Sequence, residues 1–123
     1  MNDEDPPELR GRLRAYALRI VKMYCALPKT TEAQVMGKQA LRSGTSVGAN
    51  HREATRARSN AEFISKLGDC LKELDETDYW LDLLVASEIV PEKKMASLLD
   101  ETDQLTAITT TIVKNAKGRD KNS

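Results

Sequence analysis

The sequence predicts an all-α protein that folds as an antiparallel up-down-up-down four-helix bundle. Apolar residues recur at three-and-four spacing over four long stretches, which is the spacing of one face of a helix. Short segments with proline or helix-capping residues separate these stretches, so consecutive helices must pack as antiparallel neighbours. With 123 residues and 40% hydrophobic content, the chain has enough apolar side chains for one core and a single domain, which we place at residues 8–117.

The first helix is predicted over residues 8–27, after an acidic segment, residues 1–7, that we expect to be disordered. Pro28 ends this helix because proline lacks the N–H that a helix interior requires. Its expected buried stripe consists of Leu9, Leu13, Ala17, Ile20, Tyr24 and Leu27.

The second helix is predicted over residues 31–57, with Thr30 or Thr31 as its N-cap and Gln34 completing a capping box. Its stripe is unusually small and polar for a core, and we expect Ser43 and Asn50 to be structural polar residues inside the bundle. Glycine costs about 1 kcal/mol relative to alanine inside a helix, so a break near Gly44 is the alternative to a continuous helix. The expected stripe consists of Met36, Ala40, Ser43, Val47, Asn50, Ala54 and Ala57.

The third helix is predicted over residues 60–87 and the fourth over residues 92–117, with a disordered polar tail at 118–123. Asp78 interrupts the third stripe, so we expect that stripe to pass through Thr77 instead. The other expected buried residues are Phe63, Leu67, Cys70, Leu74, Leu81 and Val85 in the third helix, and Met95, Leu98, Thr102, Leu105, Ile108 and Ile112 in the fourth.

Charge is divided sharply along the chain although 19 basic and 19 acidic residues balance overall. Residues 10–58 hold eleven Lys or Arg against two acidic residues, a net charge of +9. Residues 59–113 hold four Lys or Arg against twelve acidic residues, a net charge of −8. The folded chain can therefore present one basic and one acidic surface, suited to a polyanion or to self-association between unlike faces.

Neither the cysteines nor the hydropathy pattern indicates an exported or membrane protein. Cys25 and Cys70 lie in apolar helical patterns far apart in the chain, so we expect two buried thiols rather than a disulfide or a metal pair. No apolar stretch approaches the length of about 18 residues that a membrane span needs. We therefore expect a soluble cytoplasmic protein.

The stretch from Gln39 to Ala54, QALRSGTSVGANHREA, carries a family resemblance. Together with Glu62-Phe63, the segment from Leu71 to Leu81 and Thr110 to Lys114, it resembles the four-helix-bundle family of proteins encoded in intervening sequences of bacterial 23S rRNA genes. The family usually has glycine at the place of Ala54 and an apolar residue at the place of His51. More distantly, the chain is similar to the accessory protein of diversity-generating retroelements. The resemblance implies a ring-like homopentamer and a role in nucleic-acid binding or in assisting a nucleic-acid enzyme.

No pattern in the sequence indicates catalysis, and no cofactor or metal is expected. His51, the single histidine, lacks partners at the spacing of a helical metal site and is expected at the surface or in an interface. Asp69, Glu73 and Glu76 share one face of the third helix, where a salt-bridged surface is favoured over a cation site or an acid–base pair. A carboxylate-dependent enzyme is thus the weakest functional hypothesis.

Two hypotheses use the basic residues. The first is a non-enzymatic homo-oligomeric scaffold that binds RNA or DNA with little sequence selectivity. The second is a protein-interaction module that docks an enzyme such as a reverse transcriptase. A second apolar row, Leu18, Val21 and Cys25, with Trp80, Leu83 and Leu84 on the third helix, is expected to lie in a subunit interface. The expected phosphate contacts are Arg14, Arg52, Arg56, Arg58, Lys114 and Lys117.

Overall fold

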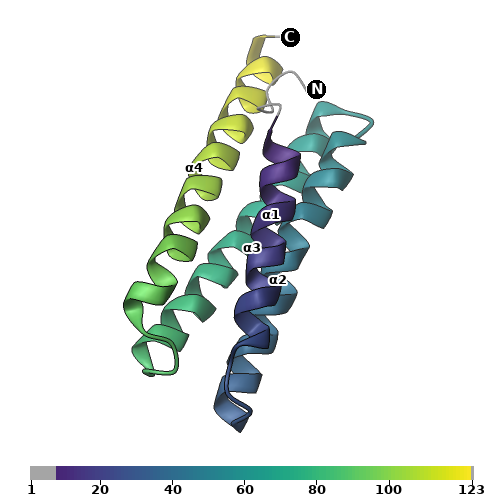
Figure 1. The fold of residues 1–123 in the computed structure, drawn as a ribbon. Coiled ribbons are helices and arrows are strands. Elements are labelled where there is room, and N and C mark those ends of the chain that lie inside the picture. Colours follow the sequence, from purple (N-terminus) through teal and green to yellow (C-terminus); the bar gives the residue numbers. More distant parts are fainter. Residues whose placement is uncertain (1–7, 123) are drawn as a thin grey trace.

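A computed structural model describes the backbone of residues 8–122 and the side chains of residues 8–119. Four helices follow one another, α1 (Leu9–Cys25), α2 (Thr31–Thr55), α3 (Asn60–Ala86) and α4 (Glu92–Asn122). They run alternately up and down, and α2 packs between α1 and α3 while α4 lies against α3 (Figure 1). The contact between α1 and α4 is much narrower than the other three. The predicted all-α up-down bundle is confirmed.

Short polar segments start two of the helices. The Thr30 hydroxyl accepts a hydrogen bond from the Ala33 N–H, and the Ser59 hydroxyl accepts one from the Glu62 N–H at 3.1 Å. These bonds satisfy N–H groups that have no partner inside the first helical turn. Gln34 does not complete a capping box, because its side chain donates to the Pro28 carbonyl and accepts from the Tyr24 hydroxyl.

Helix α2 is continuous through its three glycines, so the alternative of a break near Gly44 is wrong. Two of the glycines allow α1 to lie close. A Cβ at Gly44 would lie 2.8 Å from Ile20 Cγ1, and a Cβ at Gly37 would lie 2.4 Å from Leu27 Cδ1. Close packing of α1 thus offsets the low helix propensity of glycine at these positions.

The core is aliphatic, as the sequence predicts, but its stripe along α2 differs from the prediction. His51 is buried at 3% exposure and Asn50 is half-buried, so the expected places of these two neighbours are reversed. The reason is that α2 is covered by α1 on one side and by α3 on the other, which widens its buried sector. The residues that α2 buries are Ala33, Gly37, Ala40, Ser43, Gly44, Val47, His51 and Ala54.

The other helices bury most of the predicted residues with local shifts. In α1, Tyr16 is buried while Ala17 and Tyr24 are half-buried. In α3, the stripe passes through Thr77 as expected and ends on Leu84, with Val85 half-buried. In α4, Thr109 and Ala116 are buried and Ile108 is half-buried.

Two further predictions are corrected. Cys25 is exposed, because it lies on the outer face at the end of α1, whereas Cys70 is buried; neither forms a disulfide. Helix α4 runs to Asn122 instead of giving way to a disordered tail at Gly118. The Asn60 side chain explains this extension, since its Nδ2 donates to the Ala116 carbonyl and its Oδ1 accepts from Arg119 Nη2 at 2.9 Å. The predicted disordered segment at residues 1–7 lies outside the described residues.

Hydroxyl groups inside the core form pairs across the helices. The Thr77 hydroxyl donates to Ser43 Oγ at 2.8 Å, which joins α3 to α2, and Ser43 in turn donates to the Gln39 carbonyl. The Tyr16 hydroxyl lies 2.7 Å from Thr102 Oγ1, which joins α1 to α4. Burial of Tyr16 raises its pKa to about 12. Such pairs fix helix register, because a shift would leave buried hydroxyls without partners.

A bidentate ion pair closes the narrow seam between α1 and α4. Arg12 Nε donates to Glu101 Oε2 and Arg12 Nη2 to Glu101 Oε1, both at 2.8 Å. The hydrogen bond from Arg12 holds the pKa of Glu101 below its usual value of 4.5. Both side chains are partly buried, and charge-assisted hydrogen bonds are stronger than hydrogen bonds between neutral groups.

We expect Glu101→Gln to lower the free energy of unfolding by about 1–2 kcal/mol at neutral pH, because it leaves Arg12 without its carboxylate. Because the pKa of Glu101 is lower in the folded state, its ionised carboxylate contributes fully to stability above pH 4.5. This contribution is lost as the pH falls through the lowered pKa. Urea unfolding at pH 7 and at pH 3 measures both effects. The exposed Glu88→Gln is the matched control, and an equal loss from both variants would contradict the assignment.

Candidate nucleic-acid interface

The basic groove is a shallow hollow of about 250 Å³ between α1 and α2, in the half of the bundle where α1 begins. Arg10 and Arg14, one helical turn apart on α1, face Arg52 on α2 across it. Several of the side chains between them are small, so a hollow remains between the arginine side chains. The full lining is Arg10, Leu13, Arg14, Ala17, Thr45, Gly48, Ala49, His51 and Arg52.

None of the three arginines is neutralised within the described side chains, residues 8–119. No carboxylate of these residues lies within ion-pair distance of Arg10, Arg14 or Arg52. Two other cations of the basic half are paired, since Arg12 contacts Glu101 and Arg42 contacts Glu73 and Glu76. Three positive charges without a carboxylate partner among the described side chains therefore border the groove.

The remaining predicted contacts lie at the same end of the bundle but do not line the groove. Arg56 and Arg58 are exposed at the C-terminal end of α2 and in the turn to α3. Lys114 and Lys117 are exposed on α4 near Ala116, whose carbonyl is bound by Asn60 of α3 (Figure 1). The predicted set is thus divided into a groove pair, Arg14 and Arg52, and four outlying cations.

Comparison with known proteins agrees with this fold. The family model described as 23S rRNA-intervening sequence protein matches residues 11–111. The chain belongs to this family. A crystal structure of a protein of unknown function from the S23 ribosomal protein family of Bacteroides thetaiotaomicron VPI-5482 superposes with a TM-score of 0.81. The two sequences are 40% identical, and the match covers 86% of this chain and 98% of that one. No curated protein matches the chain.

In this member of the 23S rRNA-intervening sequence protein family, the predicted polar core residues have separate roles. Ser43 is fully buried and bonded to Thr77. Asn50 lies beside Asp69, Lys72 and Glu73 in a small hollow between α2 and α3. His51 was expected at the surface or in an interface, yet it is packed at the inner edge of the basic groove.

Two of the three acidic residues of α3 that the sequence singles out, Glu73 and Glu76, form ion pairs with α2. Glu73 Oε2 lies 3.2 Å from Arg42 Nη1, and Glu76 contacts the other guanidinium nitrogen. The cation that contacts both is Arg42 of α2. Lys66 contacts Glu53 at 3.1 Å. Among the described residues, no group of three or more His, Cys, Asp or Glu is placed to hold a metal ion.

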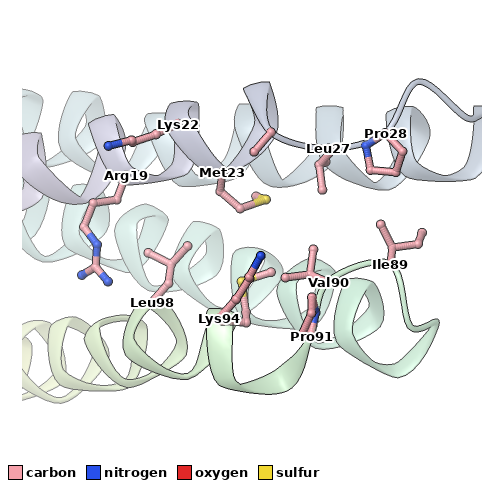
Figure 2. Close-up of a pocket in the computed structure, with 12 residues that line it drawn as sticks. Arg19, Lys22, Met23, Leu27, Pro28, Ile89, Val90, Pro91, Lys94 and Leu98 are labelled. Atoms are coloured by element: carbon pink, nitrogen blue, oxygen red, sulfur yellow. The ribbon is translucent and has the colours of Figure 1, made fainter.

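A larger hollow of about 510 Å³ lies at the opposite end of the bundle, where α1 ends and α4 begins. Figure 2 shows apolar side chains of the α1 end and of the α3–α4 turn facing each other across it, among them Leu27 and Val90. Arg19, Lys22 and Lys94 also line it. Its lining is mainly apolar, so it differs in character from the basic groove. None of the described helices is long and apolar enough to cross a membrane.

Sequence reasoning missed Arg10 and His51 as lining residues of the groove. The spacing of Arg10 and Arg14 by four residues was a usable signal, because such residues lie on the same side of a helix. Residue spacing could not predict that His51 lines the groove, because the position of its side chain depends on the rotation of α2 about its axis relative to α1.

Proposed function

We propose that this protein is a non-enzymatic, homo-oligomeric scaffold that binds RNA or DNA through the basic groove, with little sequence selectivity. The observation that carries the proposal is the convergence of Arg10, Arg14 and Arg52 on one open hollow without a carboxylate partner among the described side chains. Arginine binds phosphate oxygens through paired N–H groups, and phosphate contacts carry no base preference.

The outlying cations extend this surface. Arg56, Arg58, Lys114 and Lys117 are all exposed in the half of the bundle that holds the groove, where they can contact further phosphates of the same strand. Self-association, with a pentamer as the form that the family resemblance implies, repeats the groove in each copy. Each weak contact then contributes to a larger total affinity through effective concentration.

The groove is the part of the proposal that a binding experiment can test directly. Fluorescence anisotropy with labelled single-stranded and duplex RNA and DNA measures affinity between about 50 and 200 mM salt. The three arginines of the groove alone predict that affinity falls at least about 20-fold over this range, and phosphate contacts of the outlying cations make the fall steeper. We expect the triple variant Arg10→Gln, Arg14→Gln, Arg52→Gln to lose at least about tenfold in affinity and to show a shallower salt dependence.

The matched control removes the same number of positive charges elsewhere. Lys29→Gln, Lys38→Gln and Lys93→Gln change exposed lysines away from the groove and should leave affinity within about twofold. Absence of binding at low salt, or an equal loss in the control, would contradict the proposal. If the groove instead binds an acidic protein surface, for example that of a reverse transcriptase, one protein should co-purify with the unaltered chain. This co-purification should be lost in the triple arginine variant.

A further inference from the structure

The hollow of about 510 Å³ where α1 ends and α4 begins, which we call the apolar hollow, has the size of a small-ligand pocket. Such pockets usually measure about 300–1,000 Å³ and are lined mainly by apolar side chains. Leu27 and Leu98 line it and are each 5% exposed, and Met23 and Val90 are half-buried beside them. Because α1 and α4 make only a narrow contact, this space remains open between their ends.

The turn from α3 to α4 holds one wall of the apolar hollow in place. Glu88 has φ 64, the left-handed conformation in which helices commonly end and which glycine usually adopts. The Glu88 N–H donates to the Val85 carbonyl at 2.9 Å, and the N–H groups of Ile89 and Val90 both donate to the Leu84 carbonyl. These bonds fix the turn with Val90 facing the end of α1 (Figure 2). The wall is therefore formed before any ligand binds, which lowers the cost of binding.

Three cations line the apolar hollow together with these side chains, Arg19 and Lys22 from α1 and Lys94 from α4. Figure 2 shows the Arg19 guanidinium extending towards α4 and the Lys94 ammonium extending towards α1. Within residues 8–119, no aspartate or glutamate lines the hollow, and no carboxylate lies within ion-pair distance of the three cations. Arg19 Nη2 donates to Ser97 Oγ at 2.9 Å, and its other N–H groups can bind an anion.

The apolar lining and the cations together favour one class of ligand. A hydrocarbon chain gains free energy when it leaves water for this lining. A carboxylate at the edge gains charge-assisted hydrogen bonds from arginine and lysine. A nucleic-acid strand would instead bring phosphate groups against apolar side chains, where loss of their hydration is costly.

We propose that the apolar hollow binds a small anionic amphiphile, a carboxylate on a single hydrocarbon chain. The chain lies against Leu27, Val90 and Leu98, and the carboxylate lies between Arg19 and Lys94. This site is separate from the proposed nucleic-acid function, because the hollow lies at the opposite end of the bundle and shares no lining residue with the basic groove.

Sodium decanoate, kept below the concentration at which it forms micelles, is the probe. Isothermal titration calorimetry measures its affinity and stoichiometry, and backbone amide chemical shifts locate it. We expect saturable binding of one decanoate per chain, with the largest shift changes in residues 19–28 and 89–98. Decyltrimethylammonium has the same chain with the opposite charge, and acetate has the head group without the chain. Each should bind at least about tenfold more weakly than decanoate.

Two variants and a matched control test the lining. Arg19→Gln with Lys94→Gln removes the two facing cations and should weaken decanoate binding at least about tenfold. Ala26→Trp places a bulky side chain in the hollow from an exposed position and should abolish binding. Lys29→Gln with Lys93→Gln removes two exposed lysines that do not line the hollow and should leave affinity within about twofold. Thermal melting by circular dichroism confirms that each variant folds.

Several results would overturn the proposal. They are the absence of saturable decanoate binding, equal binding of decyltrimethylammonium, and an equal loss of affinity in the lysine control. Capture of phosphatidylglycerol vesicles, or of a helical peptide of leucine and glutamate, without decanoate binding would also overturn it, because a membrane surface or a protein would then be the occupant.

The result is separable from that of the nucleic-acid proposal. The triple variant Arg10→Gln, Arg14→Gln, Arg52→Gln should bind decanoate within about twofold of the unaltered protein, because none of these arginines lines the apolar hollow. Loss of decanoate binding in this variant would place the ligand in the basic groove and overturn the inference. If decanoate binds as expected but oligonucleotides never bind, the amphiphile site stands and the nucleic-acid role fails.

Discussion

Gly44→Val is expected to lower the free energy of unfolding by more than about 3 kcal/mol. The valine side chain would overpack the contact between α1 and α2 at Ile20. A Cβ at this position would lie 2.8 Å from Ile20 Cγ1, 3.0 Å from Cγ2 and 3.2 Å from Cδ1. Ile20 is fully buried and β-branched, so its side chain has no alternative rotamer into which it can retreat. Valine adds two further methyl groups, and α1 must move away from α2 to accept them. Urea unfolding followed by circular dichroism at 222 nm measures the change.

The alanine variants at two glycines provide the control for this prediction. Gly68 lies inside α3, and no atom of a packed neighbour would lie within 4 Å of a Cβ at this position. Gly68→Ala should therefore raise the free energy of unfolding by about 0.5–1 kcal/mol through helix propensity. Gly44→Ala gains the same propensity but meets Ile20, and we expect a net loss of about 1 kcal/mol. If both variants stabilised the protein, the close approach of α1 to α2 would not be set by Gly44.

Spacing predicted the helices because each apolar face continues over several turns. The stripe of α3 shows how far this reasoning reaches: the carboxylate of Asp78 excluded it from the interior, and Thr77 was correctly expected in its place. Proline and capping residues likewise placed the helix starts at Thr31, Asn60 and Glu92. The end of α4 was not predictable in this way, because the Asn60 contacts that support it join residues far apart in sequence.

The rotation of α2 was the main feature that spacing could not predict. Its stripe contains alanine, glycine and serine on adjacent positions, so two neighbouring helix faces have nearly equal hydrophobicity. Asn50 and His51 are both polar, and only the positions of α1 and α3 decide that His51 is the buried one. The basic groove depends on this rotation, since Arg52 would otherwise not face Arg10 and Arg14. The candidate site could therefore be predicted as a set of cations but not as a groove.

Phe63→Ala is expected to lower the free energy of unfolding by about 3–5 kcal/mol, the usual range for a fully buried aromatic residue. Phe63 is 0% exposed and is the largest apolar side chain in the first turns of α3. Small domains have a total stability of about 5–15 kcal/mol, so this single change removes a large fraction of it. Chemical unfolding measures the loss. Phe63→Leu should cost much less, and Val35→Ala, at a position 56% exposed, should stay within about 0.5 kcal/mol.

Phe63→Ala also tests whether the core around Phe63 stabilises the end of the bundle that carries the four outlying cations. Phe63 lies beside the turn that carries Arg56 and Arg58, and Asn60 in the same turn of α3 holds the end of α4 near Lys114 and Lys117. A cavity at Phe63 should therefore increase amide hydrogen exchange first at the end of α2 and in the C-terminal part of α4, before the middle of the bundle. Uniform loss of protection along all four helices would show that this end does not open separately, and that its cations are held by the bundle as a whole.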